Sequence, residues 1–289
     1  MSLNSLLSMK KNGLTAAQQR ALKFITENHE ETIFLTASAL SRRIGVSEAT
    51  IVRLAQNLGF DGYRGMQRML RESFQDRLST DVRLKQTVEH AKTDEDVLMK
   101  VMQEDIRNIT QTLESISIET FHQAVTEMAT ARKIFVIGLK GSHSTAVVLA
   151  RYLGFLREGI HLLKPEFGDI WDSFHEVGEK DLVVGISFPR YPRLTIEALA
   201  HARAQGARVG AITDSLFSPL ADHAHWVLPV KHNLDSFIES YTAVMSLVNA
   251  LLTALSIQNP QETLKALKKR ESLWRKKEIY WMTQEKENA

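Results

Sequence analysis

Residues 38–60, SALSRRIGVSEATIVRLAQNLGF, predict two short amphipathic helices joined by a three-residue turn. The small side chain of Ser41 allows the two helices to approach closely, and Gly45 opens the turn between them. The β-branched Ile51 is then placed to fill the angle between the helices. This pattern is typical of a helix-turn-helix, the motif that places its second helix in the major groove of DNA.

The second helix of the motif begins with residues that suit its amino end. Ser47 is placed to accept hydrogen bonds from the free amides there, and the helix dipole favours the charge of Glu48. The residues that we expect to face DNA are Ser47, Glu48, Ala49, Thr50 and Arg53.

Two of these residues are candidates for contacts with bases. Thr50 and Arg53 occupy the face expected to enter the groove, and a guanidinium can bind a guanine edge through two hydrogen bonds. The alternative for Arg53 is an ordinary solvent-exposed position on a helix. Contacts with phosphates are predicted for the arginines around the motif, namely Arg42, Arg43, Arg64 and Arg68.

Length and composition indicate a protein of two domains. The chain has 289 residues, of which 44% are hydrophobic, which is enough for two domains and a sizeable core. The formal net charge of +2 argues against a protein that coats nucleic acid in bulk, although residues 1–77 hold 11 Lys and Arg against 7 Asp and Glu. Cysteine is absent, which excludes disulfides and thiolate chemistry. No secretion signal or membrane span is apparent, so we expect a cytoplasmic protein.

The hydrophobic pattern divides the chain into four segments. Residues 1–77 predict a helical DNA-binding bundle, whose first helix starts where Thr15 and Gln18 form a capping pattern. Residues 78–104 contain no glycine or proline and predict a helical linker. Residues 105–258 follow as a ligand-sensing domain, and residues 259–289 as a basic C-terminal helix.

The third segment predicts an α/β fold. Short β-branched apolar runs alternate there with helical stretches, at residues 133–138, 181–187, 208–213 and 225–230. Strands that are apolar on both faces are typical of parallel sheets that helices cover on both sides. We therefore predict an all-α helix-turn-helix bundle followed by a parallel-sheet domain.

In such sheets, ligands bind where loops leave the carboxyl ends of the strands. The first candidate loop contains Gly138 and Gly141, which permit tight turns, and the hydroxyls of Ser142 and Ser144. With the free amides of the next helix, these groups suit an anion. The alternative is that the two glycines serve only the turn.

The second candidate loop, SFPRYPR at residues 187–193, combines Ser187 with two arginines. Arg190 and Arg193 suit a carboxylate or phosphate group, which arginine binds through two hydrogen bonds. The alternative is that the arginines are solvated or pair with Glu166 or Asp169.

The remaining polar residues carry weaker signals. Thr213 ends a strand, where its hydroxyl contributes to the site or caps the turn. His223 and His225 lack further metal ligands, and no nucleophile motif is present, so we expect no metal, no cofactor and no catalytic residue. The basic residues of 265–277 predict a solvated helix face whose leucines pack inward or against a second subunit; a second DNA contact is the alternative.

Together these features resemble the RpiR-type bacterial transcriptional regulators, which join a helix-turn-helix domain to a sugar isomerase (SIS) domain. The segment IGVSEATIVRLAQNLGFDGY follows that family's pattern G-V-S-x-A-T-x-x-R-x-x-x-x-L-G-F, and ISF, GARVGAITD and SPLADHAHWVL match the second domain. The resemblance implies a flavodoxin-like SIS fold, a homodimer or homotetramer, and control by a phosphorylated sugar or related metabolite.

The chain departs from this family in one loop. SIS domains that bind sugar phosphates usually carry S-x-S-G-x-T, and Ser187 retains the first serine. Here Pro189 replaces the second serine, Arg190 the glycine and Pro192 the threonine. Two hydroxyl donors are lost and a guanidinium is gained. We expect an acidic or differently phosphorylated ligand to be recognised through Arg190.

The sequence thus favours a sequence-specific transcriptional regulator, either repressor or activator, that a sugar phosphate or sugar acid controls. As a dimer it would bind a palindromic operator with half-sites about one helical turn apart. One alternative is a sugar-phosphate isomerase, which needs a positioned base. Another is a DNA-binding module without gene control, whose nonspecific phosphate contacts would weaken steeply with salt.

Overall fold

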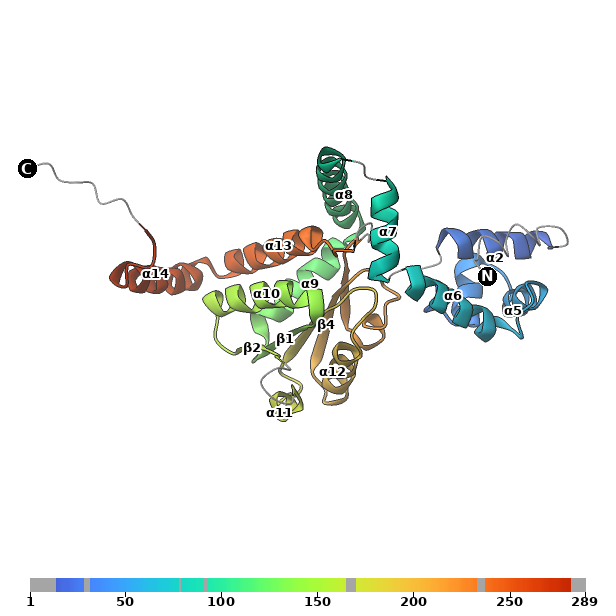
Figure 1. The fold of residues 1–289 in the computed structure, drawn as a ribbon. Coiled ribbons are helices and arrows are strands. Elements are labelled where there is room, and N and C mark those ends of the chain that lie inside the picture. Colours follow the sequence, from blue (N-terminus) through green and yellow to red (C-terminus); the bar gives the residue numbers. More distant parts are fainter. Residues whose placement is uncertain are drawn as a thin grey trace, which may run out of the picture.

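The computed structural model describes residues 14–28, 32–77, 79–90, 93–164, 170–232 and 237–281. A group of N-terminal helices and a larger domain built on a sheet lie on opposite sides of one connecting helix, α7 (Figure 1). The described helices of the N-terminal group are α2 (Ala16–Glu27), α4 (Ala37–Ile44), α5 (Glu48–Asn57) and α6 (Tyr63–Arg77).

The predicted helix-turn-helix is confirmed as α4 and α5. Gly45 ends α4 with φ of 73°, the left-handed conformation that glycine adopts without strain. Ser47 precedes α5, and its hydroxyl accepts the backbone N–H of Thr50 at 3.2 Å. The side chain of Ile51 is fully buried between the helices. The capping pattern of Thr15 and Gln18 is also present, at the start of α2.

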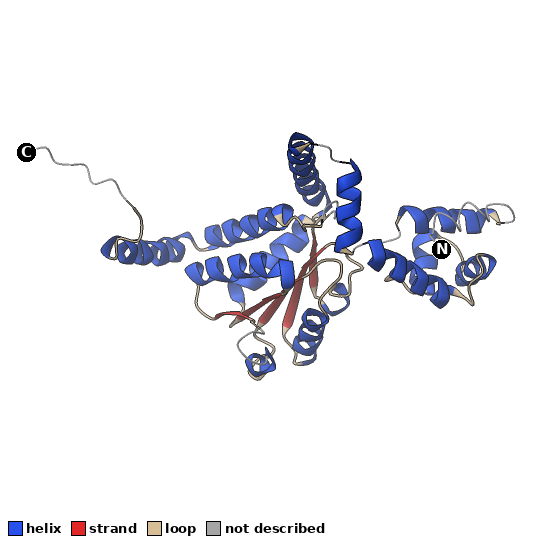
Figure 2. Cartoon of the chain, viewed as in Figure 1, coloured by secondary structure: helices blue, strands red, loops and turns tan. Residues whose placement is uncertain are grey.

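The second domain contains a five-stranded parallel sheet in the order β2-β1-β3-β4-β5, which Figure 2 shows in red. This order is that of flavodoxin-like folds. The strands are β1 (Ile134–Gly138), β2 (Ile160–Leu162), β3 (Leu182–Ile186), β4 (Arg208–Thr213) and β5 (Trp226–Pro229). The sequence pattern missed β2, because this edge strand has three residues and none of them is fully buried.

Helices cover both faces of the sheet (Figures 1 and 2). One face carries α9 (Ile118–Thr130), α10 (His143–Leu156) and α13 (Thr242–Gln258); the other carries α11 (Ile170–Phe174) and α12 (Arg193–Ala204). Alternate residues of a strand point to opposite faces. Ile134 and Val136 of β1 accordingly pack in the first core, and Phe135 and Ile137 in the second.

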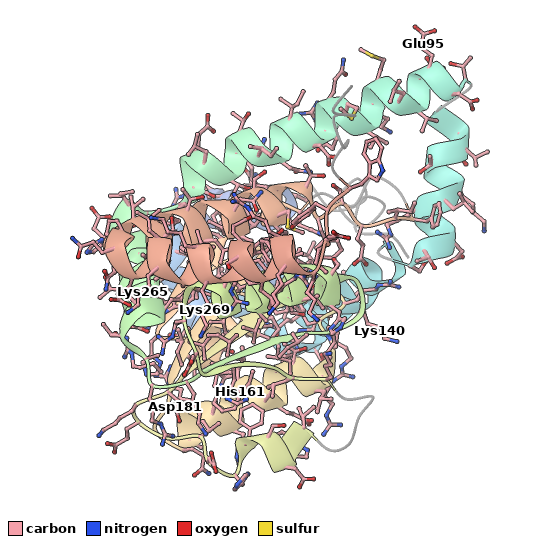
Figure 3. All side chains as sticks on the ribbon, turned by 90° about the vertical axis from the view of Figure 1, so that its left-hand side faces the viewer. Glu95, Lys140, His161, Asp181, Lys265 and Lys269 are labelled. Carbon is pink, nitrogen blue, oxygen red and sulfur yellow. The ribbon has the colours of Figure 1, made fainter. Side chains whose placement is uncertain are left out.

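Residues 78–104, where a helical linker was predicted, are helical on both sides of a break. They contain α7 (Thr80–His90) and the start of α8 (Asp94–Ser115), so α8 runs across the predicted boundary after Glu104. The hydroxyl of Thr93 and the carboxylate of Asp96 form a capping box that begins α8. Figure 3 shows Glu95 in this first turn, at the tip of α8 farthest from the sheet.

The C-terminal helix α14 (Pro260–Lys276) follows α13 and packs on α10 through Trp274 and Arg270. Lys265 and Lys269 lie on its exposed surface (Figure 3). In the described parts of the chain, no single helix is long and apolar enough to cross a membrane. Helices α13 and α14 meet that criterion only as a pair, with a bend of 109° between them.

Candidate functional site

The candidate site is a cleft of about 820 Å³ at the carboxyl ends of β1 and β3. In parallel sheets this edge is where ligands bind, because loops there lead into helix amino ends. The cleft is formed by the loop after β1, the loop after β3 and the segment before α13. Its walls consist of Leu139, Lys140, Gly141, Ser142, Ser187, Phe188, Pro189, Arg190, Pro192, Phe237, Ile238, Glu239 and Tyr241.

Four of the eight ligand-site residues predicted from the sequence line this cleft: Gly141, Ser142, Ser187 and Arg190. The side chain of Ser187 is fully buried, and its hydroxyl has no hydrogen-bond partner among the described residues. Such an orphaned hydroxyl at a cleft wall is costly unless a ligand or water satisfies it.

The other four lie outside the cleft. Arg193 is 90% exposed and pairs with Glu197 on the same helix at 2.6 Å, because it starts α12 on the solvent side. The hydroxyl of Ser144 donates to the carbonyl of Gly141, and that of Thr213 to the carboxylate of Asp214. At Gly138, a Cβ atom would lie 2.7 Å from the Ser142 carbonyl, so close packing requires this glycine.

The pairing partners considered for Arg190 were Glu166 and Asp169, which lie outside the described residues. Among the described residues, its guanidinium lies 3.6 Å from the carboxylate of Glu239. Arg190 also has φ of 71°, a conformation that is strained for residues other than glycine. This position is the one where the SIS pattern carries glycine.

Sequence reasoning missed Glu239 and Tyr241, which precede α13. The hydroxyl of Tyr241 donates to the Glu239 carboxylate at 2.8 Å and accepts from the hydroxyl of Ser142 at 3.5 Å. A Cβ atom on Gly141 would lie 2.4 Å from the Tyr241 hydroxyl, so this ring packs directly on the loop after β1. Burial raises the pKa of Tyr241 above its ordinary value, and Glu239 adds to the rise.

Two further residues behind the cleft were also missed. His232 stacks on Phe188 with 4.3 Å between ring centroids, and both of its nitrogens lack hydrogen-bond partners among the described residues. Arg83 reaches the site from α7, and its guanidinium lies 3.7 Å from Glu239. No local pattern in the sequence signals these contacts, because their partners are far away along the chain.

The predicted DNA-contacting residues cluster on α5 and its neighbours. Arg53 is exposed, as are Ser47, Glu48 and Ala49, while Thr50 is half-buried with its hydroxyl 2.8 Å from that of Ser47. Arg42, Arg64 and Arg68 are also exposed. Arg43 lies over the ring of Phe217 from the sheet domain, 5.5 Å from its centroid, so this arginine contacts the other domain.

A second cleft, of about 320 Å³, lies at the amino ends of the strands. Asp181 there is buried and accepts two hydrogen bonds from the guanidinium of Arg132. Glu127 accepts from Arg208 and from the indole of Trp226. Figure 3 shows Asp181 and Lys140 on opposite sides of the domain. Both carboxylates have partners within the protein. We therefore assign these charged residues a structural role and not a ligand-binding one.

Comparisons with known proteins match both parts of the chain. Residues 1–77 match the model of the helix-turn-helix domain of the rpiR family, and residues 127–254 match that of the SIS domain. The HTH-type transcriptional regulator RpiR of Escherichia coli K12 is 24% identical over 223 residues, which cover 77% of this chain and 74% of that protein.

Two solved structures are similar. The sugar isomerase domain of the RpiR transcription factor from Sphaerobacter thermophilus is 31% identical, with a TM-score of 0.57 over 60% of this chain and 97% of that one. The NanR protein of Vibrio vulnificus, complexed with ManNAc-6P, is 19% identical, with a TM-score of 0.61 over 93% of this chain and 97% of that one.

Proposed function

Because this chain belongs to the RpiR family of helix-turn-helix transcriptional regulators with a SIS domain, we propose that a small anionic metabolite in the SIS cleft controls its binding to a specific DNA operator. The observation that carries the proposal is the cleft at the carboxyl ends of β1 and β3. Ser142, Ser187 and Arg190 line this one space, and the buried hydroxyl of Ser187 has no hydrogen-bond partner among the described residues.

The chemistry of the cleft favours a sugar phosphate or a sugar acid. Arg190 and Lys140 supply positive charge for a phosphate or carboxylate group. Pro189 and Pro192 have no backbone N–H, so this loop offers fewer neutral donors and depends more on Arg190. The hydroxyl oxygen of Tyr241 lines the cleft and supplies an acceptor for a sugar hydroxyl. The ManNAc-6P held by the similar NanR structure supports the sugar phosphate class.

On the DNA side, we propose that Arg53 and Thr50 contact bases and that Arg42, Arg64 and Arg68 contact phosphates. All of these arginines are exposed on or beside the helix-turn-helix. Their exposure leaves the guanidinium groups accessible to a DNA backbone or to a base edge.

We further propose a homo-oligomer that binds a palindromic operator. The exposed face of α8 supports this assembly, because Leu98, Val101 and Met102 are 61%, 45% and 56% exposed. Their spacing of three and four residues places them on one side of the helix. A second copy of the chain would cover this apolar surface.

The proposal is tested in two steps with the full chain. Selection from random DNA yields the preferred sequence, and its binding is then measured at physiological salt, where nonspecific phosphate contacts are weak. A thermal-shift screen of sugar phosphates and sugar acids follows, in which a ligand raises the melting temperature as its concentration rises.

Two matched variants decide the role of the cleft. Arg190→Ala should abolish the thermal shift of the best ligand, whereas Arg193→Ala, which removes an exposed arginine outside the cleft, should leave it unchanged. Equal ligand binding by the Arg190 variant would contradict the assignment of the anion site. If the selection from random DNA enriches no sequence, the proposed regulatory function is wrong.

We also propose that the chain is not an isomerase. Proton transfer in such a reaction needs an available base. Among the described residues, the acid that lines the cleft is Glu239, which accepts from Tyr241 and lies beside two guanidinium groups. These partners occupy its oxygens, which leaves it unavailable as a base. Turnover of any hexose or pentose phosphate by the purified protein would overturn this proposal.

A further inference from the structure

Arg83 is a buried cation whose guanidinium is not satisfied within the described structure. The residue is 1% exposed, and none of its three guanidinium nitrogens has a hydrogen-bond partner among the described residues. Burial lowers the pKa of Arg83, Arg190 lowers it as well, and Glu239 opposes both. A buried charge of this kind destabilises the folded state unless an anion compensates it.

Among the described residues, Arg83 forms its ion pair with Glu239, and Arg190 shares that carboxylate. Oxygen Oε1 of Glu239 lies 3.7 Å from Arg83 and 3.6 Å from Arg190, while Oε2 accepts from the Tyr241 hydroxyl. Two guanidinium groups therefore compete for one carboxylate oxygen. Arg190 and Glu239 line the cleft, whereas Arg83 lies behind them.

Helix α7 carries Arg83 and directly follows α6 of the DNA-binding bundle (Figure 1). Among the described side chains of α7, Arg83 is the buried one, and the apolar Leu84 and Val88 are 45% and 69% exposed. The attachment of this helix to the sensor domain therefore depends strongly on the environment of one guanidinium.

We propose that the Arg83–Glu239 pair transmits occupancy of the cleft to α7 and, through α7, to the DNA-binding domain. The inference rests on the proposed function and names the residues through which ligand binding in the cleft would affect the DNA-binding domain. An anionic group that binds Arg190 releases Glu239 to pair with Arg83 and adds negative charge nearby. Both effects favour the buried Arg83, so an occupied cleft holds α7 more firmly than an empty one.

The route is tested first without a ligand, by hydrogen exchange of residues 80–90 in the full chain. Glu239→Gln removes the compensating charge, so exchange in α7 should accelerate by about tenfold or more, as local opening becomes easier. Replacing Arg83 as well, in the double variant Arg83→Met/Glu239→Gln, removes the uncompensated cation and should return exchange to within about threefold of the wild type.

Two controls show whether the change is specific. Glu197→Gln removes an acid that pairs with an exposed arginine on α12, and should leave exchange of α7 unchanged. Exchange of β3, in the centre of the sheet, reports the fold, and should be the same in every variant. Acceleration in β3 together with α7 would show general destabilisation, and the double variant then decides whether the two charges are coupled.

The second readout is affinity for the selected operator, with ManNAc-6P and inorganic phosphate as probes of the cleft. Glu239→Gln should change operator affinity by about tenfold, and the double variant should restore it. Unchanged exchange in α7, no rescue by the double variant, or loosened α7 with unchanged operator affinity would each overturn the inference. Failure of the wild type to bind any DNA selectively would overturn the proposed function instead, while the exchange result would still test the pair.

Discussion

The ring of Tyr191 packs edge-on against the ring of Phe34, with 5.8 Å between their centroids. Tyr191 follows Arg190 in the loop that lines the cleft, and its hydroxyl donates to the carboxylate of Asp214. Phe34 lies just before α4 of the DNA-binding bundle. The loop that faces the cleft thus also contacts the domain that carries the helix-turn-helix.

This aromatic contact should couple the two domains by about 0.5–1.5 kcal/mol beyond the area that it buries. The coupling is measurable as the non-additivity of Phe34→Leu and Tyr191→Leu in hydrogen exchange of α4. Tyr191→Phe keeps the ring and loses the hydrogen bond to Asp214. This variant should retain most of the coupling between the two domains. Additive effects of the two leucine variants would show that the rings contribute independently.

Arg53→Ala should relax the preference for one base position in the operator, at a cost of about 1–3 kcal/mol for the preferred sequence. The variant loses the two hydrogen bonds that the Arg53 guanidinium would donate to a base edge. Arg68→Ala is the matched comparison, since a lost phosphate contact weakens all sequences equally and reduces the salt dependence of binding. The measurement is operator affinity over a set of single-base variants; unchanged selectivity in the Arg53 variant would contradict the assignment.

Gly141→Ala should lower ligand affinity in the cleft by about tenfold or more, because the new methyl group displaces Tyr241. A Cβ atom at this position would lie 2.4 Å from the Tyr241 hydroxyl. Gly154→Ala is the control, because nothing lies within 4 Å of a Cβ atom there and alanine favours the helix. Thermal-shift titration with the best ligand compares the two, and equal affinities would show that Tyr241 does not shape the site.

Stability should fall as the pH drops from about 6.5 towards 4 because of His232. Burial lowers the pKa of this histidine to about 4, Arg83 lowers it as well, and Glu239 opposes them. Between these pH values the unfolded chain binds a proton that the folded chain excludes, so the free energy of unfolding decreases as pH falls. Above pH 6.5 the free energy of unfolding contains the whole of this contribution, and it is lost by about pH 4. Its size is about 3 kcal/mol, at 1.36 kcal/mol per pKa unit.

The measurement is chemical denaturation at a series of pH values. His232→Phe, which retains a ring to stack on Phe188, should flatten the dependence in this window. His175→Asn changes a histidine that is 72% exposed and should leave the dependence as in the wild type. If the stability of the wild type is constant from pH 7 to 4.5, folding does not hinder protonation of His232.

Local features of the fold were predictable because their causes lie within a few residues of each other. Gly45, Ser47 and Ile51 form the turn, the cap and the contact between α4 and α5. The buried strands were predictable from their apolar runs, whereas β2 was not, since a short, half-buried edge strand leaves a weak pattern.

The candidate site was predictable only in part. Topology places the loops after β1 and β3 at one edge of a parallel sheet, which is why Ser142, Ser187 and Arg190 lie in one cleft. The side-chain directions within those loops were not predictable. Arg193 begins a helix and points to solvent, while Arg190 turns inward on a left-handed backbone.

By itself, the sequence determined the helix-turn-helix, the parallel α/β domain and the altered loop, since each depends on short-range propensity or on a hydrophobic period. Only the tertiary structure decided that Arg83, Arg190 and Glu239 meet. These residues come from a connecting helix, a loop after a strand and a segment before α13, and no local signal relates them. They lie close together because these three elements pack at the same edge of the sheet, which places two cations beside one carboxylate.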